Sequence, residues 1–135
     1  MIADVGPPGA RGPAPFRRTA GGLVFISGQV GIRPDGTVPD SVEEQIELAF
    51  RRLGAVLVHE GLGFEDLVEL VSYHVRIDEQ LGAFREIKAR CITREFPAWT
   101  ILGVASLARP NLLVEIKAVA AAWVHGGRDA DCIAR

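Results

Sequence analysis

An apolar run from Leu23 to Ile26 ends abruptly in three small or polar residues, Ser27, Gly28 and Gln29. Its β-branched and aromatic side chains predict a buried strand over residues 23–28, followed by a change of direction where glycine supplies backbone freedom. A core strand that delivers a hydroxyl and an amide at its end is a common way to place a site on a rigid scaffold. Ser27 and Gln29 are therefore candidate substrate-binding residues, unless they only satisfy backbone groups where the strand ends.

Two helices are predicted further along the chain. Residues 41–44 have the form of a capping box, in which Ser41 caps the helix and Glu44 reaches back to it. An apolar stripe follows, and then Gly61, a typical residue just after a helix, so the first helix spans 42–60. A second apolar stripe predicts a helix over 79–95.

Alternation with a period of two and short apolar runs predict the other strands, at residues 16–20, 67–77, 99–107 and 112–124. The element order is then β-β-α-β-α-β-β, which indicates an α+β fold with a mixed sheet and both helices on one face. Residues 15–124 form the predicted domain. It lies between a flexible N-terminal segment, 1–14, and a frayed C-terminal tail, 125–135.

The sheet face away from the helices also needs a cover. Two helices cannot cover both faces, and the strand at 112–124 is apolar on both of its sides apart from Glu115 and Lys117. Other copies of the chain would bury this second face, so the pattern predicts an obligate homo-oligomer.

The composition is that of one globular domain: 48% of the 135 residues are hydrophobic and 24% are charged. The formal net charge of −2 gives no electrostatic reason to expect nucleic acid or a membrane surface as a partner. The apolar runs are too short to cross a membrane, and residues 1–18 lack the apolar core of a secretory signal, so a cytoplasmic location is expected. Cys91 and Cys132 show no metal spacing and are expected to be two reduced thiols.

Several stretches of the chain resemble the RidA family, also called the YjgF family and described as endoribonuclease L-PSP-like. They occur in the family's order and are Gly22-Leu-Val-Phe-Ile-Ser-Gly-Gln29, Glu44-Gln45, Leu53 to Gly61, Phe64-Glu-Asp-Leu-Val68, Phe96-Pro-Ala98 and Leu113-Val-Glu-Ile-Lys-Ala-Val-Ala120. The resemblance implies a chorismate mutase-like fold and a homotrimer whose sheets form a central barrel, with a small-molecule cleft at each subunit interface. For members with the full motif it also implies hydrolysis of enamines and imines, such as 2-aminoacrylate, to 2-keto acids and ammonia.

The same resemblance shows where this chain departs from the active deaminases. Those proteins carry an arginine directly after Pro-Ala, and this position is Trp99 here. An arginine can grip a substrate carboxylate with two N–H groups, whereas an indole offers one neutral donor. A tyrosine, a cysteine and an asparagine of the family correspond to Phe16, Ile101 and Lys88. The implied site consists of catalytic Glu115 and the substrate-binding residues Ser27, Gln29, Trp99, Phe16 and Lys88.

Each candidate also has a structural explanation. Glu115 could activate a water, with its pKa raised by burial, or form an intersubunit salt bridge with Lys117 or an arginine. Trp99 could stack on a ligand or plug the cleft. Four arginines are possible replacement anchors or solvated charges: Arg17, Arg18, Arg33 and Arg76. Three histidines lack ligand spacing and are taken as structural: His59, His74 and His125. No pattern indicates a metal or a nucleotide cofactor.

Three functions from different classes follow. The retained Glu115 favours a hydrolase acting on an enamine, imine or related compound that is not held by the standard arginine–carboxylate contact. The missing arginine at position 99 favours a non-catalytic trimer that binds a metabolite and regulates or protects another protein. RNA cleavage is disfavoured, because the chain is acidic overall and lacks a basic stripe with interleaved aromatic residues. The hydrolase is preferred.

Overall fold

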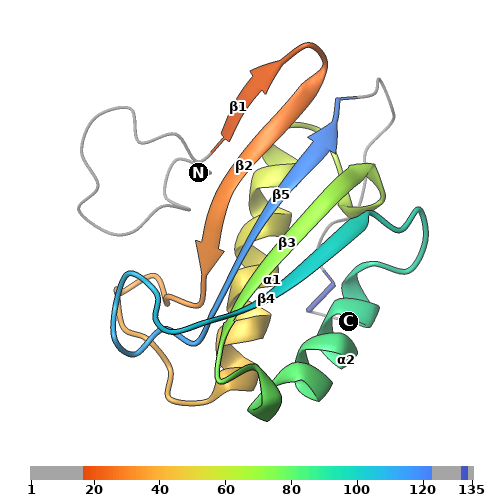
Figure 1. The fold of residues 1–135 in the computed structure, drawn as a ribbon. Helices are drawn as coiled ribbons and strands as arrows, with labels where there is room; N and C mark the ends of the chain where they lie inside the picture. The colour runs from red at the N-terminus through yellow and green to blue at the C-terminus, as the bar shows by residue number, and fades with distance from the viewer. Residues whose placement is uncertain (1–16, 123–131, 134–135) are drawn as a thin grey trace.

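The computed structural model describes residues 17–122 together with Cys132 and Ile133. In this part of the chain one five-stranded sheet has the order β1-β2-β5-β3-β4 (Figure 1). Its strands are β1 (Arg17–Ala20), β2 (Leu23–Val30), β3 (Leu67–Val75), β4 (Ala98–Val104) and β5 (Val114–Ala121). Neighbouring strands are antiparallel except β3 and β4, which are parallel. The predicted element order and α+β class are confirmed.

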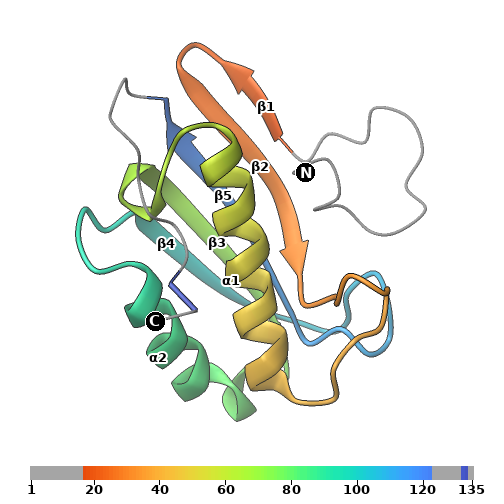
Figure 2. The same ribbon diagram turned by 180° about the vertical axis from the view of Figure 1, so that it is seen from behind.

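Both helices lie on the same face of the sheet, as Figure 2 shows. They are α1 (Val42–His59) and α2 (Leu81–Cys91). The core fills the layer between them and the sheet, with Phe50, Phe84 and Ile116 fully buried. No helix in the described ranges is long and apolar enough to cross a membrane. The opposite face of the sheet, called the open face below, carries no helix in the described structure (Figure 1).

The first helix begins and ends where the sequence predicts. Ser41 caps it, since its hydroxyl accepts the backbone N–H of Glu44 at 3.2 Å. At the other end Gly61 has a φ of 75°, the left-handed conformation that lets the chain leave the helix. The Glu44 carboxylate lies 3.0 Å from the guanidinium of Arg33. The sequence predicted that Glu44 would reach back to Ser41. The guanidinium of Arg33 is a charged donor, and it binds a carboxylate more strongly than the backbone N–H of Ser41 would.

Most of the remaining elements are shorter than the sequence pattern predicts, whereas β2 runs beyond the predicted 23–28 to Val30. A short turn over Ile77–Glu79 precedes α2, which ends at Cys91 because Ile92 is already extended. The final strand stops at Ala121, and β4 stops at Val104. The expected start of the first strand, Phe16, and the predicted segment 1–14 lie outside the described residues.

The expectation of two reduced thiols is wrong, because Cys91 and Cys132 form a disulfide. Both cysteines are buried, and Ile133 packs against the same core beside the end of α2. Spacing along the chain does not show how close two residues 41 positions apart come in space. The rest of the predicted tail, 125–131 and 134–135, lies outside the described residues.

Candidate functional site

A β-bulge in β2 forms the centre of the candidate site. Ile26 pairs with Ala118 and Gln29 pairs with Ile116, so β2 uses one residue more than β5 between these two pairs. Such an extra residue bends the strand and re-aims its side chains. The bulge brings the backbone of Gly28 against Glu115, because a Cβ at position 28 would lie 2.3 Å from Glu115 Oε2. Glycine is therefore required here for the carboxyl group to occupy its place.

Gln29 stabilises this bulge. Its side chain is buried, and its amide donates a hydrogen bond to the backbone carbonyl of Ser27 at 3.0 Å. Gln29 pairs with Ile116, a core residue, so it faces the helices rather than the open face. The sequence predicted that Gln29 either binds substrate or satisfies a backbone group. This geometry matches the second role.

Glu115 lies on the open face. Its neighbours in β5, Val114 and Ile116, are fully buried in the core, and side chains alternate along a strand. Burial raises the pKa of the Glu115 carboxyl group above its ordinary value. No lysine or arginine of the described chain lies within 4.0 Å of it, so no salt bridge within the subunit offsets this effect.

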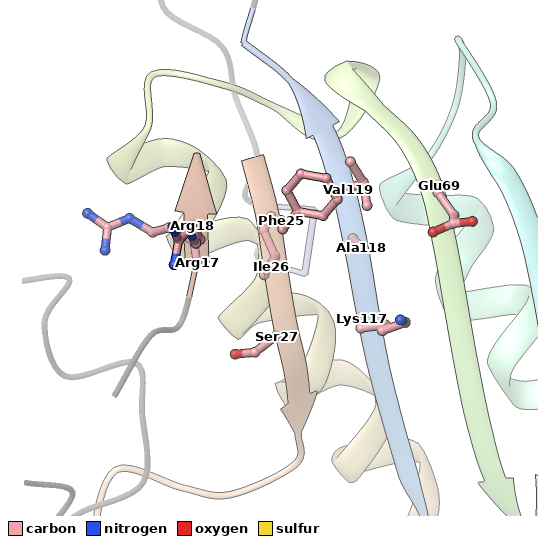
Figure 3. A pocket seen from close by; sticks show the side chains of 9 residues that line it. All are labelled: Arg17, Arg18, Phe25, Ile26, Ser27, Glu69, Lys117, Ala118 and Val119. Carbon is pink, nitrogen blue, oxygen red and sulfur yellow. The ribbon is translucent and has the colours of Figure 1, made fainter. Parts of the chain in front are cut away.

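A cavity of about 330 Å³ occupies the open face beside the bulge (Figure 3). It is lined by Arg17, Arg18, Phe25, Ile26, Ser27, Glu69, Lys117, Ala118 and Val119. In Figure 3 the ring of Phe25 lies between β2 and β5, and Ser27 lies at one end of the group. The sequence singles out Ser27, Arg17 and Arg18 in this lining but not the apolar residues Phe25, Ile26, Ala118 and Val119. The one sequence signal for these apolar residues is the apolar outer side of the last strand.

Of the four arginines considered as replacement anchors, three have carboxylate partners in the described chain. The pairs are Arg17 with Glu60 at 2.5 Å, Arg33 with Glu44 at 3.0 Å, and Arg76 with Glu79 at 3.2 Å. Within the same part of the chain Arg18 has no carboxylate within 4.0 Å, and it lines the cavity. Arg18 is thus the arginine best placed to meet an anion on the open face.

Trp99 lies on the other side of the sheet, in a buried chain of hydrogen bonds. Its indole N–H donates to Ser72 Oγ at 2.9 Å, and that oxygen lies 2.8 Å from His74 Nε2. His74 Nδ1 lies 2.8 Å from Gln80 Oε1. The alternation of β3 was predicted from its sequence, and these polar side chains occupy the side that faces the helices. They can be buried there because each one has a partner.

The partners also determine which atoms carry the hydrogens. The Gln80 amide nitrogen donates to two backbone carbonyls, at 2.8 and 2.9 Å, so the Gln80 oxygen faces the ring and His74 Nδ1 must carry a hydrogen. Nε2 of the neutral ring then accepts from the Ser72 hydroxyl, whose oxygen accepts from Trp99. Burial lowers the pKa of His74, which favours this neutral form.

His74 gives a testable dependence of stability on pH. The pKa is lowered in the folded state, so between that value and the ordinary 6.5 the unfolded chain binds more protons. We expect the free energy of unfolding to fall as pH drops below about 6.5, by at most about 1.4 kcal/mol per pH unit for this one group. Urea unfolding of wild type and His74→Gln from pH 5 to 7.5 measures it.

In that comparison, the wild type should lose more stability on acidification than His74→Gln. Glu115 acts in the opposite sense, because its raised pKa makes stability fall as pH rises. Its contribution is common to both proteins and cancels in the difference. Equal pH slopes for the two proteins would contradict the assignment.

Trp99 and Glu115 cannot share a site within one chain. Trp99 pairs in register with Leu70, a fully buried core residue, and it stacks on Phe84 of α2 with ring centroids 5.7 Å apart. The Lys88 amine lies 4.3 Å from the centre of the indole. These contacts place Trp99 and Lys88 on the helix side, whereas Glu115 lies on the open face. Phe16, the remaining predicted site residue, lies outside the described residues.

In the described residues, these features define a small α+β domain with a cavity on the face of the five-stranded sheet that no helix covers. The sequence pattern of the family described as Endoribonuclease L-PSP matches residues 15–122. The chain therefore belongs to this family, the RidA or YjgF family.

Several relatives are similar over most of this chain. The RutC family protein YjgH of Escherichia coli K12 is 36% identical over 102 residues, which are 75% of this chain and 76% of that protein. The 2-iminobutanoate/2-iminopropanoate deaminase of Mus musculus is 30% identical over 122 residues, 89% of each chain. The crystal structure of E. coli TdcF with bound serine has a TM-score of 0.75 at 26% identity, covering 85% of this chain and 92% of TdcF.

Proposed function

We propose that the chain forms a homotrimer with small-molecule clefts at its subunit interfaces and hydrolyses an enamine, imine or related metabolite. The observation that carries this proposal is Glu115. Its carboxyl group is packed against the glycine of a β-bulge, its pKa is raised by burial, and it lies on the same face as the cavity at Ser27. A carboxyl group whose pKa is moved toward neutral is suited to both accept and donate a proton.

The proposed assembly is supported by the open face. Phe25 is 46% exposed there, and Leu102 is 42% exposed on the outer strand β4. Covering such side chains is a typical role of another copy of the chain. Within one subunit, Trp99 and Glu115 lie on opposite faces of the sheet. A neighbouring copy could bring its own Trp99 toward this Glu115. The solution mass should then be three times the 14.5 kDa of one chain, which sedimentation equilibrium measures.

The proposed reaction needs only water and a group that handles protons. The Glu115 carboxylate takes a proton from water, the water oxygen forms a bond to the carbon of the protonated imine, and the C=N electron pair moves to the nitrogen. The carbinolamine so formed loses its C–N bond as the proton on Glu115 passes to the departing nitrogen. Its hydroxyl proton passes to the Glu115 carboxylate as the carbonyl forms, and is then released to ammonia or solvent. The products are a carbonyl compound and ammonia. Burial of the carboxyl group favours its return to the protonated state between these steps.

The deaminase names of relatives support this choice, since one at 30% identity is a 2-iminobutanoate/2-iminopropanoate deaminase. A cytoplasmic location is part of the proposal. The Cys91–Cys132 disulfide would then have to persist in a reducing compartment.

The decisive experiment measures hydrolysis of imines generated enzymatically from several amino acids. Glu115→Gln keeps the shape of the side chain but removes its acid–base function, so we expect kcat to fall at least about a hundredfold. Gly28→Ala should also lose activity, because its Cβ would displace the Glu115 carboxyl group. The matched control is Gly82→Ala, where an added Cβ meets nothing within 4 Å. Full activity of Glu115→Gln, or no hydrolysis by wild type, would contradict the proposal.

One observation favours a second function, a metabolite-binding or regulatory trimer without catalysis. Trp99 is held by Ser72 and Phe84 within its own subunit, so it occupies the family's arginine position as a fixed structural group. Trp99→Arg distinguishes the two functions in the same assay. Activity gained by the variant over an inactive wild type would support the binding protein.

A further inference from the structure

The Cys91–Cys132 disulfide joins a helix to two residues that lie outside the regular structure. Cys91 is the last residue of α2, whereas Cys132 and Ile133, called the clasp below, belong to no helix or strand of the described chain. In Figure 2 the clasp lies beside α2. The five described strands and both α-helices are complete without it. Detaching the clasp would therefore break no pairing of the sheet and no turn of a helix.

Side-chain packing and the disulfide hold the clasp in place. Cys132 is buried in the core, and the half-buried side chain of Ile133 packs against the same core. Cys91 is buried as well, so the disulfide is shielded from solvent while the clasp is seated. A segment that contributes only a few side chains to the core opens at a lower free-energy cost than the whole domain. Opening of the clasp is therefore the least costly event that exposes the disulfide.

The disulfide also holds the last turn of α2. Lys88 lies in this turn, and its amine is 4.3 Å from the centre of the Trp99 indole. Phe84 lies two turns before Cys91 on the same face of the helix, and its ring stacks on the indole. The indole N–H donates to Ser72 at 2.9 Å, so the ring is fixed from the side of the sheet as well. A movement of the last turn of α2 would therefore change the surroundings of Trp99.

We propose that the Cys91–Cys132 disulfide is a reversible thiol–disulfide switch, in which opening of the clasp admits a reductant and reduction frees the last turn of α2. The reductant is a dithiol. One of its thiolates attacks a sulfur of the bridge to form a mixed disulfide, and its second thiolate then displaces the protein sulfur. Two electrons and two protons pass to the protein, which is left with two thiols, and the dithiol becomes a disulfide.

Closure of the switch is the reverse exchange, with a small disulfide as the oxidant. The Cα atoms of Cys91 and Cys132 are 4.7 Å apart, a separation at which two cysteines form a bridge without backbone movement. Persistence in a reducing compartment would then mean that the bridge closes again after it opens. This switch goes beyond the proposed hydrolysis and does not depend on it.

The first test follows reduction of the folded protein by dithiothreitol without denaturant, with the free thiols alkylated and counted by mass. We expect the bridge to open at least about tenfold faster than the domain unfolds, because only the clasp has to detach. The unfolding rate comes from urea kinetics extrapolated to water. Ile133→Ala removes part of the packing of the clasp, so it should speed reduction at least about fivefold.

Val42→Ala is the matched control. Val42 is also half-buried against the core, but it lies at the start of α1 and outside the clasp. It should change the rate of reduction by no more than about twofold, because local opening does not involve it. Reduction no faster than unfolding, or equal acceleration by Ile133→Ala and Val42→Ala, would overturn the inference.

The second test asks whether the reduced state is folded and distinct. The chain has two tryptophans, so Trp99→Phe identifies the Trp99 indole N–H signal in a nitrogen-15 correlation spectrum. Dithiothreitol should shift this signal while the spectrum stays that of a folded protein, and oxidised glutathione should then restore it. In Cys91→Ser/Cys132→Ser neither reagent should move the signal. An unchanged Trp99 signal in wild type, an irreversible shift, or unfolding on reduction would overturn the inference.

Discussion

Cys132→Ser is expected to lower the free energy of unfolding by about 4 kcal/mol. The Cys91–Cys132 disulfide joins residues 41 positions apart, and closing a loop of that length removes conformational entropy from the unfolded chain. Cys132 is also nearly fully buried, so its loss loosens the contact between the end of α2 and Ile133. Urea unfolding of wild type and variant, both without reductant, measures the difference.

Reductant provides the internal control for this prediction. Dithiothreitol should lower the unfolding midpoint of wild type toward that of the variant and leave a Cys91→Ser/Cys132→Ser double variant unchanged. A wild-type midpoint that ignores reductant, in protein shown to be reduced by thiol titration, would contradict it.

Phe84→Ala is expected to cost about 3–5 kcal/mol of unfolding free energy. The Phe84 ring is fully buried and meets Phe50, His74 and Trp99 at centroid distances of 5.5, 4.6 and 5.7 Å. Removing it leaves a cavity beneath α2 and withdraws the support of the indole. Chemical denaturation measures the loss.

Phe96→Ala is the matched control, because Phe96 is 71% exposed. Its removal should change the free energy of unfolding by no more than about 0.5 kcal/mol. Equal costs for the two variants would show that Phe84 does not support the core as described.

The elements that depend on local sequence were predicted best. The helix expected over 42–60 occurs as Val42–His59, because its cap, its apolar stripe and Gly61 are all local signals. The second helix was predicted to run to 95 but ends at Cys91. Its apolar stripe reaches Ile92, and the sequence does not show that this side chain enters the core from extended backbone.

The sequence names candidate site residues but does not show how they are arranged. Ser27 and Glu115 lie on one face, as a shared site requires, but the sequence could not reveal the bulge that brings Gly28 against Glu115. A bulge depends on which residues pair across two strands that are far apart in the chain. The same reason explains why Trp99 was not placed on the opposite face.

The buried chain of hydrogen bonds was missed for a related reason. The alternation predicted for residues 67–77 places Ser72 and His74 on the same side of the strand. It could not show that this side faces the helices, because the partners that satisfy these groups, Gln80 and Trp99, belong to other elements.

The disulfide also changes how the subunit would respond to mechanical force. Strands β4 and β5 both lie between Cys91 and Cys132, so a pull on the two ends of the chain passes through the sulfur bridge and bypasses them. Of the described strands and α-helices, only β1, β2, α1, β3 and α2 lie in the path of the load. Stretching should therefore peel β2 and β3 from β5, their common neighbour in the sheet, while the loop that holds β5 stays closed.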